Sequence, residues 1–482
     1  MPVQKFIGYA PDADPATPGV LTDCEMMEPA LRGMKSAPSA AATNLPALVA
    51  ECRGASAVTK LDGTRRLFAG TQTDLYEAGS ATWTGVSSAT YTGSAESMWD
   101  FAQWGNITLA VNGVDLAQES TSGAFSDLTA MPIATLVCAV SNFVMVANIA
   151  DASYTHPDGW WSCALGNYTD WTPSIATQSA RGRLIDTPGK ITALKALGSD
   201  VVAFKHQSVY LGRYVGPDII WSWQQVPGTL GVQSQKGVVS DGTALYFWGG
   251  DDFYRFDGTR PQPIGEPVKR WFRRNASQMY LHKMAGQFDR ERSLVRWYFV
   301  AGGGSALNSC IVFNAKSGQW GRADRTIEAV VDYVSAAITW DSPGILTGLT
   351  WDDATYTQSW DSPFWLASSE SPAIIDSTHT LKTLTGVSGA SSVTTGDIGD
   401  DDVFTLLRRV RPRYSTHPST AAMKNYWTNA SGSAVTLDQS VSASDGKFDV
   451  LQSARWHRLR FDWTGDTEVS GINADMVREG ER

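Results

Sequence analysis

Residues 191–212 read ITALKALGSDVVAFKHQSVYLG, and this stretch decides the fold. It holds three apolar runs, separated by Gly198-Ser199-Asp200 and by Lys205-His206-Gln207. Short apolar runs bounded by turn residues indicate antiparallel strands joined by hairpins. The same arrangement returns in residues 244–258, where Gly249-Gly250-Asp251 separates two aromatic-rich runs. The sequence therefore predicts sheets built from consecutive hairpins.

A tyrosine recurs in the returning strand of three such units, at Tyr76, Tyr210 and Tyr254. The first two are 134 residues apart and the last two 44, so the longer separation is close to three of the shorter. A period of roughly 40–50 residues filled with hairpins is typical of propeller blades, which need neighbours to cover their faces. We predict an all-β protein in which residues 46–330 form a β-propeller of about six blades. An irregular β array or a run of sandwiches is the alternative.

Two further hairpins carry clear turn signals. Asn112-Gly113 lies between the apolar runs 108–111 and 114–118. Asn-Gly favours a two-residue turn because both positions tolerate positive φ. Ser141-Asn142 separates two longer apolar runs in the same way. Both stretches are expected inside the propeller.

The rest of the chain divides into three segments. Residues 1–45, rich in Pro, Ala and Asp, are expected as an extended N-terminal arm that wraps a neighbour, or as a disordered tail. Residues 331–402 are interpreted as a Trp/Asp-rich β-turn segment, with Trp-Asp pairs at Trp340, Trp351 and Trp360, followed by a Gly/Ser/Thr-rich linker. The indoles are expected to pack rather than to stack on a sugar. Residues 403–482 are expected as a C-terminal β segment that completes the propeller or forms an added domain.

Composition limits the function classes. The chain has 39 basic and 49 acidic residues, a formal net charge of −10. This argues against tight DNA binding by the whole surface, but it suits a wall that DNA slides past. No apolar run reaches the roughly 18 residues of a membrane helix, and the start lacks a signal-peptide pattern, so synthesis in a cytoplasm is expected.

Signatures of catalysis and metal binding are missing from the sequence. It has no P-loop, no H-E-x-x-H and no G-x-S-x-G, and its six His are never at metal-ligand spacing. The five Cys form no C-x-x-C pair and are expected as buried free thiols. We therefore predict no enzymatic activity, no cofactor and no metal.

Arginines concentrate near the C-terminus. Arg408, Arg409, Arg411 and Arg413 lie within six residues, more than a solvated strand face usually carries. They are the candidate contact with a partner or another subunit, with a solvated face as the alternative. A second basic stretch, residues 455–463, alternates with apolar residues as a half-buried strand does. A third, in residues 266–275, predicts a short helix with a solvated basic face, beginning at Pro267.

At the level of pattern, the chain resembles the tail nozzle or hub proteins of short-tailed bacteriophages, also called packaged-DNA stabilisation proteins. The residues that carry the resemblance run in the same order over most of the chain: 12–39 (the arm), 101–106 with 110–115 (a second-blade hairpin), 191–214 and 231–258 (central blades), and 455–462 with 469–472 (a final strand pair).

The resemblance implies a propeller with an added domain, assembled as a homohexameric ring in the virion tail. Such a ring continues the channel of the portal and adaptor proteins, retains the packaged double-stranded DNA and opens for ejection. It also meets tail fibre or spike proteins, for which the Trp-Asp segment is a candidate contact. Two alternatives stay open: a carbohydrate-binding or carbohydrate-active propeller, and another virion component such as a collar or fibre-attachment protein.

Overall fold

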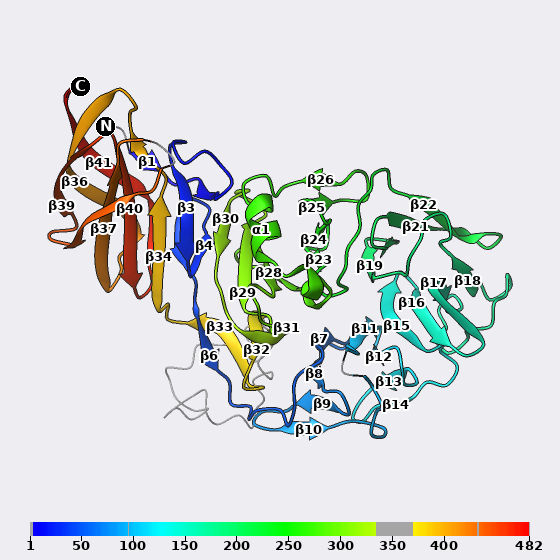
Figure 1. Cartoon of the computed structure of the whole chain (residues 1–482). Helices are drawn as coiled ribbons and strands as arrows, with labels where there is room; N and C mark the ends of the chain where they lie inside the picture. Colours follow the sequence, from blue (N-terminus) through cyan, green and yellow to red (C-terminus); the bar gives the residue numbers. More distant parts are fainter. Residues whose placement is uncertain (1–2, 95, 334–369, 431–432, 482) are drawn as a thin grey trace, which may run out of the picture.

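The computed structural model describes residues 3–94, 96–333, 370–430 and 433–481. These residues form a ring of small sheets joined to a two-sheet domain at one side (Figure 1). The Trp-Asp pairs at 340, 351 and 360 lie outside the described residues.

Within the described residues between Ala55 and Arg322, the ring holds six four-stranded antiparallel blades. This confirms the expected β-propeller of about six blades. From inner to outer strand the blades are β7–β10 (Ala55–Thr59, Arg65–Gly70, Leu75–Ala78, Trp83–Gly85), β11–β14 (Asp100–Trp104, Ile107–Val111, Gln118–Ser120, Ser126–Asp127), β15–β18 (Ala134–Val140, Phe143–Asp151, Tyr154–Ser162, Ala180–Arg183), β19–β22 (Ala193–Leu197, Asp200–Phe204, Val209–Gly216, Ile220–Gln225), β23–β26 (Val239–Ser240, Leu245–Trp248, Phe253–Phe256, Gln262–Pro263) and β27–β30 (Ala285–Asp289, Leu294–Phe299, Ser309–Asn314, Trp320–Arg322).

A further four-stranded sheet closes the ring between the sixth blade and the first. Its strands are β31 (Ile327–Tyr333), β32 (Ser371–Asp376), β33 (Leu381–Gly386) and β6 (Ser39–Ala42). Ala329 and Val331 pack against Leu67 of the first blade, and Ile374 packs against Val312 of the sixth. The outer strand β6 comes from the N-terminal segment, so the two ends of the propeller are joined by one sheet.

The recurring tyrosines occupy equivalent places. Tyr76, Tyr210 and Tyr254 lie in β9, β21 and β25, each the third strand of its blade. The period read from the sequence is therefore the period of the blades. Ser141-Asn142 forms the expected two-residue turn, because Val140 pairs with Phe143.

The Asn-Gly hairpin differs from its prediction. Strand β12 pairs with β13, but the loop between them runs from Asn112 to Ala117 instead of covering two residues. The Asn112 carboxamide oxygen accepts hydrogen bonds from the backbone N–H groups of Val114 and Asp115, at 3.0 and 2.9 Å. This Asx turn bends the chain locally and replaces the tighter turn.

The two-sheet domain is a β-sandwich. One sheet continues from β30 through β4 (Met27–Pro29), β5 (Met34–Ser36), β41 (Glu468–Glu481), β36 (Val403–Thr416) and β39 (Phe448–Ala454), with β1 (Gln4–Lys5) paired to β41. The other runs β2 (Gly8–Tyr9), β3 (Val20–Glu25), β34 (Ala390–Thr395), β40 (Trp456–Thr464), β37 (Thr420–Thr428) and β38 (Thr436–Ser442), with β35 (Ile398–Gly399) on β40. Leu407 and Val410 of the first sheet and Met423 and Phe461 of the second belong to one buried core. Strands β36 to β41, from the segment expected to complete the propeller or to form an added domain, thus belong to this sandwich and not to the propeller.

The N-terminal segment is neither a free arm nor a tail in the described residues. Strands β1 to β5 are built into the sandwich and β6 into the propeller. The carboxylate of Glu28 on β4 accepts hydrogen bonds from Arg296 Nε and Nη2 at 2.8 and 3.1 Å, and Arg296 also pairs with Asp289 at 3.1 Å. Glu28 is 2% exposed and Arg296 0%. This buried ion network fixes the segment, and with it the sandwich, to the sixth blade.

The expected linker is also wrong where the structure describes it. Residues 390–395 form β34, which lies between β3 and β40, and Val393 is fully buried. The short helix is confirmed as α1 (Lys269–Asn275), which starts two residues after Pro267, and a 3-10 helix, η1 (Gln278–Lys283), follows. All five cysteines are free and buried, as expected. In the part of the chain that the structure describes, no helix is long and apolar enough to cross a membrane.

Candidate interaction surface on the sandwich

The four predicted arginines lie on β36, a strand on the side of the sandwich away from the propeller (Figure 1). Along the strand, Val410 and Pro412 are buried while Arg411 and Arg413 are exposed, as alternation in a half-buried strand requires. The register shifts between Leu407 and Arg409 against both neighbouring strands. A bulge of this kind puts two successive residues on one side of a sheet, so Arg408 joins the outward row.

Two of these arginines have partners on the neighbouring strands. Arg408 Nη2 lies 2.9 Å from Asp475 Oδ1 of β41, and Arg409 Nε lies 2.7 Å from Asp449 Oδ1 of β39. The hydrogen bonds that Arg408 and Arg409 donate hold the pKa of Asp475 and of Asp449 below the ordinary value. Both pairs are solvent-exposed, so they add little to the stability of the fold.

The other two are not engaged. Arg411 pairs across the sheet with Asn473, and Arg413 with Gly471, neither of which carries charge. Among the described residues no hydrogen bond or ion pair holds either guanidinium group. Two cations therefore project from this part of β36. Leu451 (77% exposed) and Val477 (39%) add apolar surface on the neighbouring strands, at the level of Leu406 to Arg409.

The second basic stretch is satisfied within the chain. On β40, Arg458 Nη2 lies 2.8 Å from Asp397 Oδ1, and Arg460 pairs with Asp462 at 3.0 Å and Glu25 at 3.3 Å. Of the two C-terminal arginine clusters, the one on β36 carries the unpaired charge.

Sequence reasoning missed an acidic edge of the same domain. Asp400, Asp401 and Asp402 form the loop just before β36, and Glu479 lies beside β36 on β41. A groove of about 550 Å³ opens next to this loop; Val3, Ile7, Ile398 and Trp456 are among its lining residues. The signal was the run of three aspartates, which its Gly- and Ser-rich context made look like a linker.

The basic helix α1 is mostly engaged. The Asp12 carboxylate accepts hydrogen bonds from the backbone N–H groups of Arg270 and Trp271 at 2.5 and 3.0 Å. Lys269 pairs with Asp252 at 3.1 Å, and Arg274 lies 3.6 Å from Asp12. The backbone N–H groups of α1 thus hold Asp12, and with it the N-terminal segment, against the propeller, with Arg274 nearby.

A charged group also lies among the inner strands of the propeller. Asp100 on β11 pairs with Lys236 at 3.3 Å and accepts hydrogen bonds from Gln235 and from the backbone N–H of Val137. Burial lowers the pKa of nearby Lys195. This network ties neighbouring blades together; in the described ranges no three His, Cys, Asp or Glu side chains are placed to hold a metal ion.

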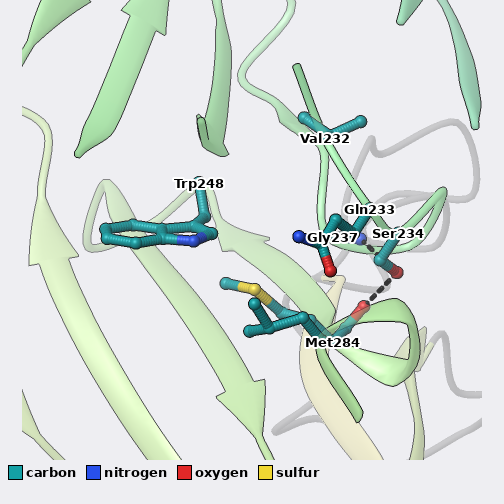
Figure 2. A pocket seen from close by; sticks show the side chains of 7 residues that line it. Val232, Gln233, Ser234, Gly237, Trp248 and Met284 are labelled. Carbon is teal, nitrogen blue, oxygen red and sulfur yellow. Dashed lines mark hydrogen bonds between the residues drawn. The ribbon is translucent and has the colours of Figure 1, made fainter. Parts of the chain in front are cut away.

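A second enclosed space is too small for a ligand. Figure 2 shows Trp248 and Met284 facing each other across it, with Ser234 bonded to the carbonyl oxygen of Met284 at 2.5 Å. Its volume is about 10 Å³, which is room for one water molecule. The Trp248 Nε1–H is buried without a protein acceptor, and such a water would accept its hydrogen bond.

Tryptophans offer no open platform for a sugar in the described part of the chain. The tryptophan side chains of the described residues are all buried or half-buried. Tyr154 and Trp161, which form an aromatic pair on blade three, are covered by the guanidinium group of Arg181 at 4.5 and 4.7 Å. Each of these two rings thus has a face covered by Arg181.

The fold and site together define a β-propeller protein with a fused β-sandwich that carries an arginine row. No family model and no curated protein sequence matches the chain. Among solved structures it is similar to the WD40 domain of Pan2 from Neurospora crassa, with a TM-score of 0.37, 8% identity, and coverage of 70% of this chain and 96% of that one. It is also similar to YCF48 from Cyanidioschyzon merolae (TM-score 0.35, 12% identity, 62% and 94% covered) and to human WBSCR16 (0.35, 8%, 59% and 85%).

Proposed function

We propose that this chain is a structural, non-enzymatic virion protein of a short-tailed bacteriophage, the subunit of a tail nozzle or hub ring. The ring, a homohexamer in the proposal, would lie below the portal and adaptor proteins, retain the packaged DNA and form the channel for its ejection. Its other partners would be tail fibre or spike proteins, and assembly would take place in the host cytoplasm. The alternative virion roles, collar or fibre attachment, differ in position in the particle rather than in fold.

The observation that carries the proposal is the outward arginine row on β36. Arg411 and Arg413 are exposed cations with no side-chain partner among the described residues. Exposed, unpaired guanidinium groups are typical of a protein–protein contact, in which arginine is enriched.

The construction of the chain supports an assembly role. The sheet that contains β36 continues into the sixth blade through β4, and the Glu28–Arg296–Asp289 network is buried at that junction. The sandwich and the propeller are therefore held at a fixed angle. A ring needs such rigidity, because a small rotation between contact surfaces, repeated from subunit to subunit, would prevent closure.

Immunogold electron microscopy of virus particles from the source of the sequence tests the proposal. An antibody against the sandwich should label one site per particle, at the tail vertex. Labelling over the whole capsid, or on no particle, would contradict it. Binding to an array of glycans would favour the carbohydrate alternative instead.

A further inference from the structure

The hairpin of β21 and β22 ends in exposed apolar residues on the outer side of the fourth blade. Val215 is 53% exposed and Ile219 is 68% exposed. The Trp221 N–H donates a hydrogen bond to the Ile219 carbonyl oxygen at 2.8 Å, and Ile220 between them has φ +64°. Such a γ-turn is rare and strained, and a β-branched residue seldom adopts positive φ. The turn buries Ile220 (5% exposed) and holds its neighbour Ile219 outward.

The remainder of this tip is fixed and carries one unmatched charge. The Tyr214 hydroxyl donates a hydrogen bond to the side chain of Gln178. The charge of Arg213 is matched by Asp200, which lies 3.0 Å away. Asp218 is exposed, and its carboxylate has no hydrogen bond or ion pair among the described residues. The tip is therefore an ordered apolar surface with a free carboxylate, and an ordered surface loses little conformational entropy on binding.

A groove of complementary character lies on the sandwich. Its volume is about 550 Å³, and its lining includes Val3 (40% exposed), Ile7 (48% exposed), Ile398 and Trp456. This volume is within the range of roughly 300–1,000 Å³ that binding pockets occupy. Apolar walls of this kind favour the apolar side chains of a partner, because contact removes both surfaces from water.

Cations border the groove on one side. Lys5 of β1 is among its lining residues, and it is in register with Gly471 of β41, which is in register with Arg413 of β36. Residues directly opposite each other point to the same face of a sheet, so Lys5 and Arg413 share a face with no side chain between them. Both are exposed and without a side-chain partner in the part of the chain that the structure describes. Asp397, which also lines the groove, is held by Arg458 at 2.8 Å, so this border is positively charged.

The hairpin tip and the groove lie at opposite ends of the molecule. Figure 1 shows β21 and β22 at the outer side of the propeller, on the right, and β1 and β40 in the sandwich, on the left, with other blades between them. The tip therefore cannot reach the groove of its own chain. The same tip on a second copy brings two exposed apolar side chains and a carboxylate, which match the walls and the border of the groove.

We propose that the sandwich groove of one copy receives the β21–β22 tip of a second copy of this chain. Val215 and Ile219 pack into the apolar groove, and Asp218 faces Lys5 and Arg413 at its border. Copies then join head to tail, because the tip and the groove are different surfaces, and a heterologous contact closes into a ring when its rotation divides a full turn. The inference rests on the proposed function, since it supplies the contact by which that ring would form.

Removing the apolar side chains of the tip tests the contact. Val215→Ser with Ile219→Ser should weaken self-association at least about tenfold in sedimentation velocity, because the groove then loses the apolar surface that it covers. The matched control is Val49→Ser with Leu61→Ser, which removes two apolar side chains that are 77% and 81% exposed in the loops before and after β7. The control should leave association unchanged. Equal effects of the two pairs of substitutions, or no effect of the first, would overturn the inference.

Charge exchange tests which groups face each other. Asp218→Lys places a cation against the positive border, and Lys5→Glu with Arg413→Glu makes that border acidic. Each of these variants should associate more weakly at low salt, because like charges then face each other. The chain that carries all three changes should associate again, and continued weak association of that chain would contradict the inference.

Covalent capture detects a weak contact. With Lys5→Cys and Asp218→Cys in one chain, mild oxidation should give a disulfide ladder that extends beyond dimers, against a background of buried native thiols. A chain with only one of the two changes should stay monomeric, because head-to-tail joining brings unlike positions together. Absence of the ladder, or a dimer as the main product of either single change, would overturn the inference.

The ladder also separates this inference from the proposed function. If the protein occurs in particles at a ring's copy number but gives no ladder, the inference fails and the proposed function stands. A ladder from a protein that is absent from particles gives the reverse result.

Discussion

Replacing Glu28 by Gln should loosen the junction between the propeller and the sandwich. The carboxylate lies 2.8 Å from Arg296 Nε, and the two side chains are 2% and 0% exposed. Burial raises the pKa of Glu28, but the charge of Arg296 outweighs burial and holds it below the ordinary value. The group is therefore ionised, and the neutral amide leaves Arg296 with Asp289 alone.

The magnitude follows from burial. Removing one partner of a buried ion pair destabilises a protein by about 3–5 kcal/mol, because it leaves a charge without compensation. Asp289 remains 3.1 Å from Arg296, so we expect the lower value, about 3 kcal/mol. For a transition whose denaturant dependence is about 3 kcal/mol per molar urea, this moves the midpoint down by about 1 M.

Urea unfolding followed by tryptophan fluorescence measures the effect, with Trp297 buried on the same strand as Arg296. The control is Asp200→Asn, which breaks the Asp200–Arg213 pair; at 25% and 56% exposure it should cost less than about 1 kcal/mol. Equal midpoints for Glu28→Gln and Asp200→Asn would refute the reasoning that this junction is a buried ion network.

Two further predictions concern a buried histidine and two glycines. Burial lowers the pKa of His457, whose Nε2 bonds the carbonyl oxygen of Thr405. The unfolded chain therefore binds a proton near pH 6.5 that the folded chain does not. As the pH falls below 6.5, the free energy of unfolding should decrease by up to about 1.4 kcal/mol per pH unit. His457→Gln should remove that part of the slope in urea midpoints from pH 7.5 to 5.5, and an unchanged slope would contradict it. Gly33 has φ +86° and an added Cβ would lie 2.2 Å from the Val469 carbonyl oxygen, whereas Gly63 has φ +83° and open space. Gly33→Ala should therefore lower the melting temperature clearly more than Gly63→Ala, which meets only the backbone cost of about 1 kcal/mol; equal shifts would show that close packing is not what requires Gly33.

Local pairing made the blades predictable. In the hairpin of β19 and β20, Leu197 pairs with Asp200 around Gly198 and Ser199, so both strands and their turn lie in one short window. The third-strand tyrosines then repeat with the blades. The Asn112 loop shows the limit of this reasoning. Asn112-Gly113 favours a two-residue turn, but hydrogen bonds to the Asn112 side chain stabilise a longer loop instead.

Long-range pairing was not predictable. Ala42 of β6 pairs with Lys382 of β33, and Met27 of β4 with Arg322 of β30. No periodicity in a short, Ala- and Pro-rich stretch identifies a partner so far along the chain, which is why residues 1–45 looked like an arm. Strand β34 was missed for a related reason: its Ser and Thr residues resemble a linker until neighbours on both sides bury it.

The sequence predicted the strand that carries the candidate site but not the pairing of its side chains. The density of arginines identified β36, but which of them stay unpaired depends on Asp449 and Asp475, contributed by strands that the sequence does not align with it. The groove depends on β1, β35 and β40 meeting in space, and no local pattern contains that information.

The central claim is that this chain is a ring-forming subunit of a virus tail. Quantitative peptide mass spectrometry of purified particles, with the portal protein as internal reference, tests it most directly. The account predicts a fixed low copy number, about six per particle and far below that of the capsid protein, as one closed ring requires. Absence of the chain from particles, or a copy number that follows the capsid protein, would contradict it.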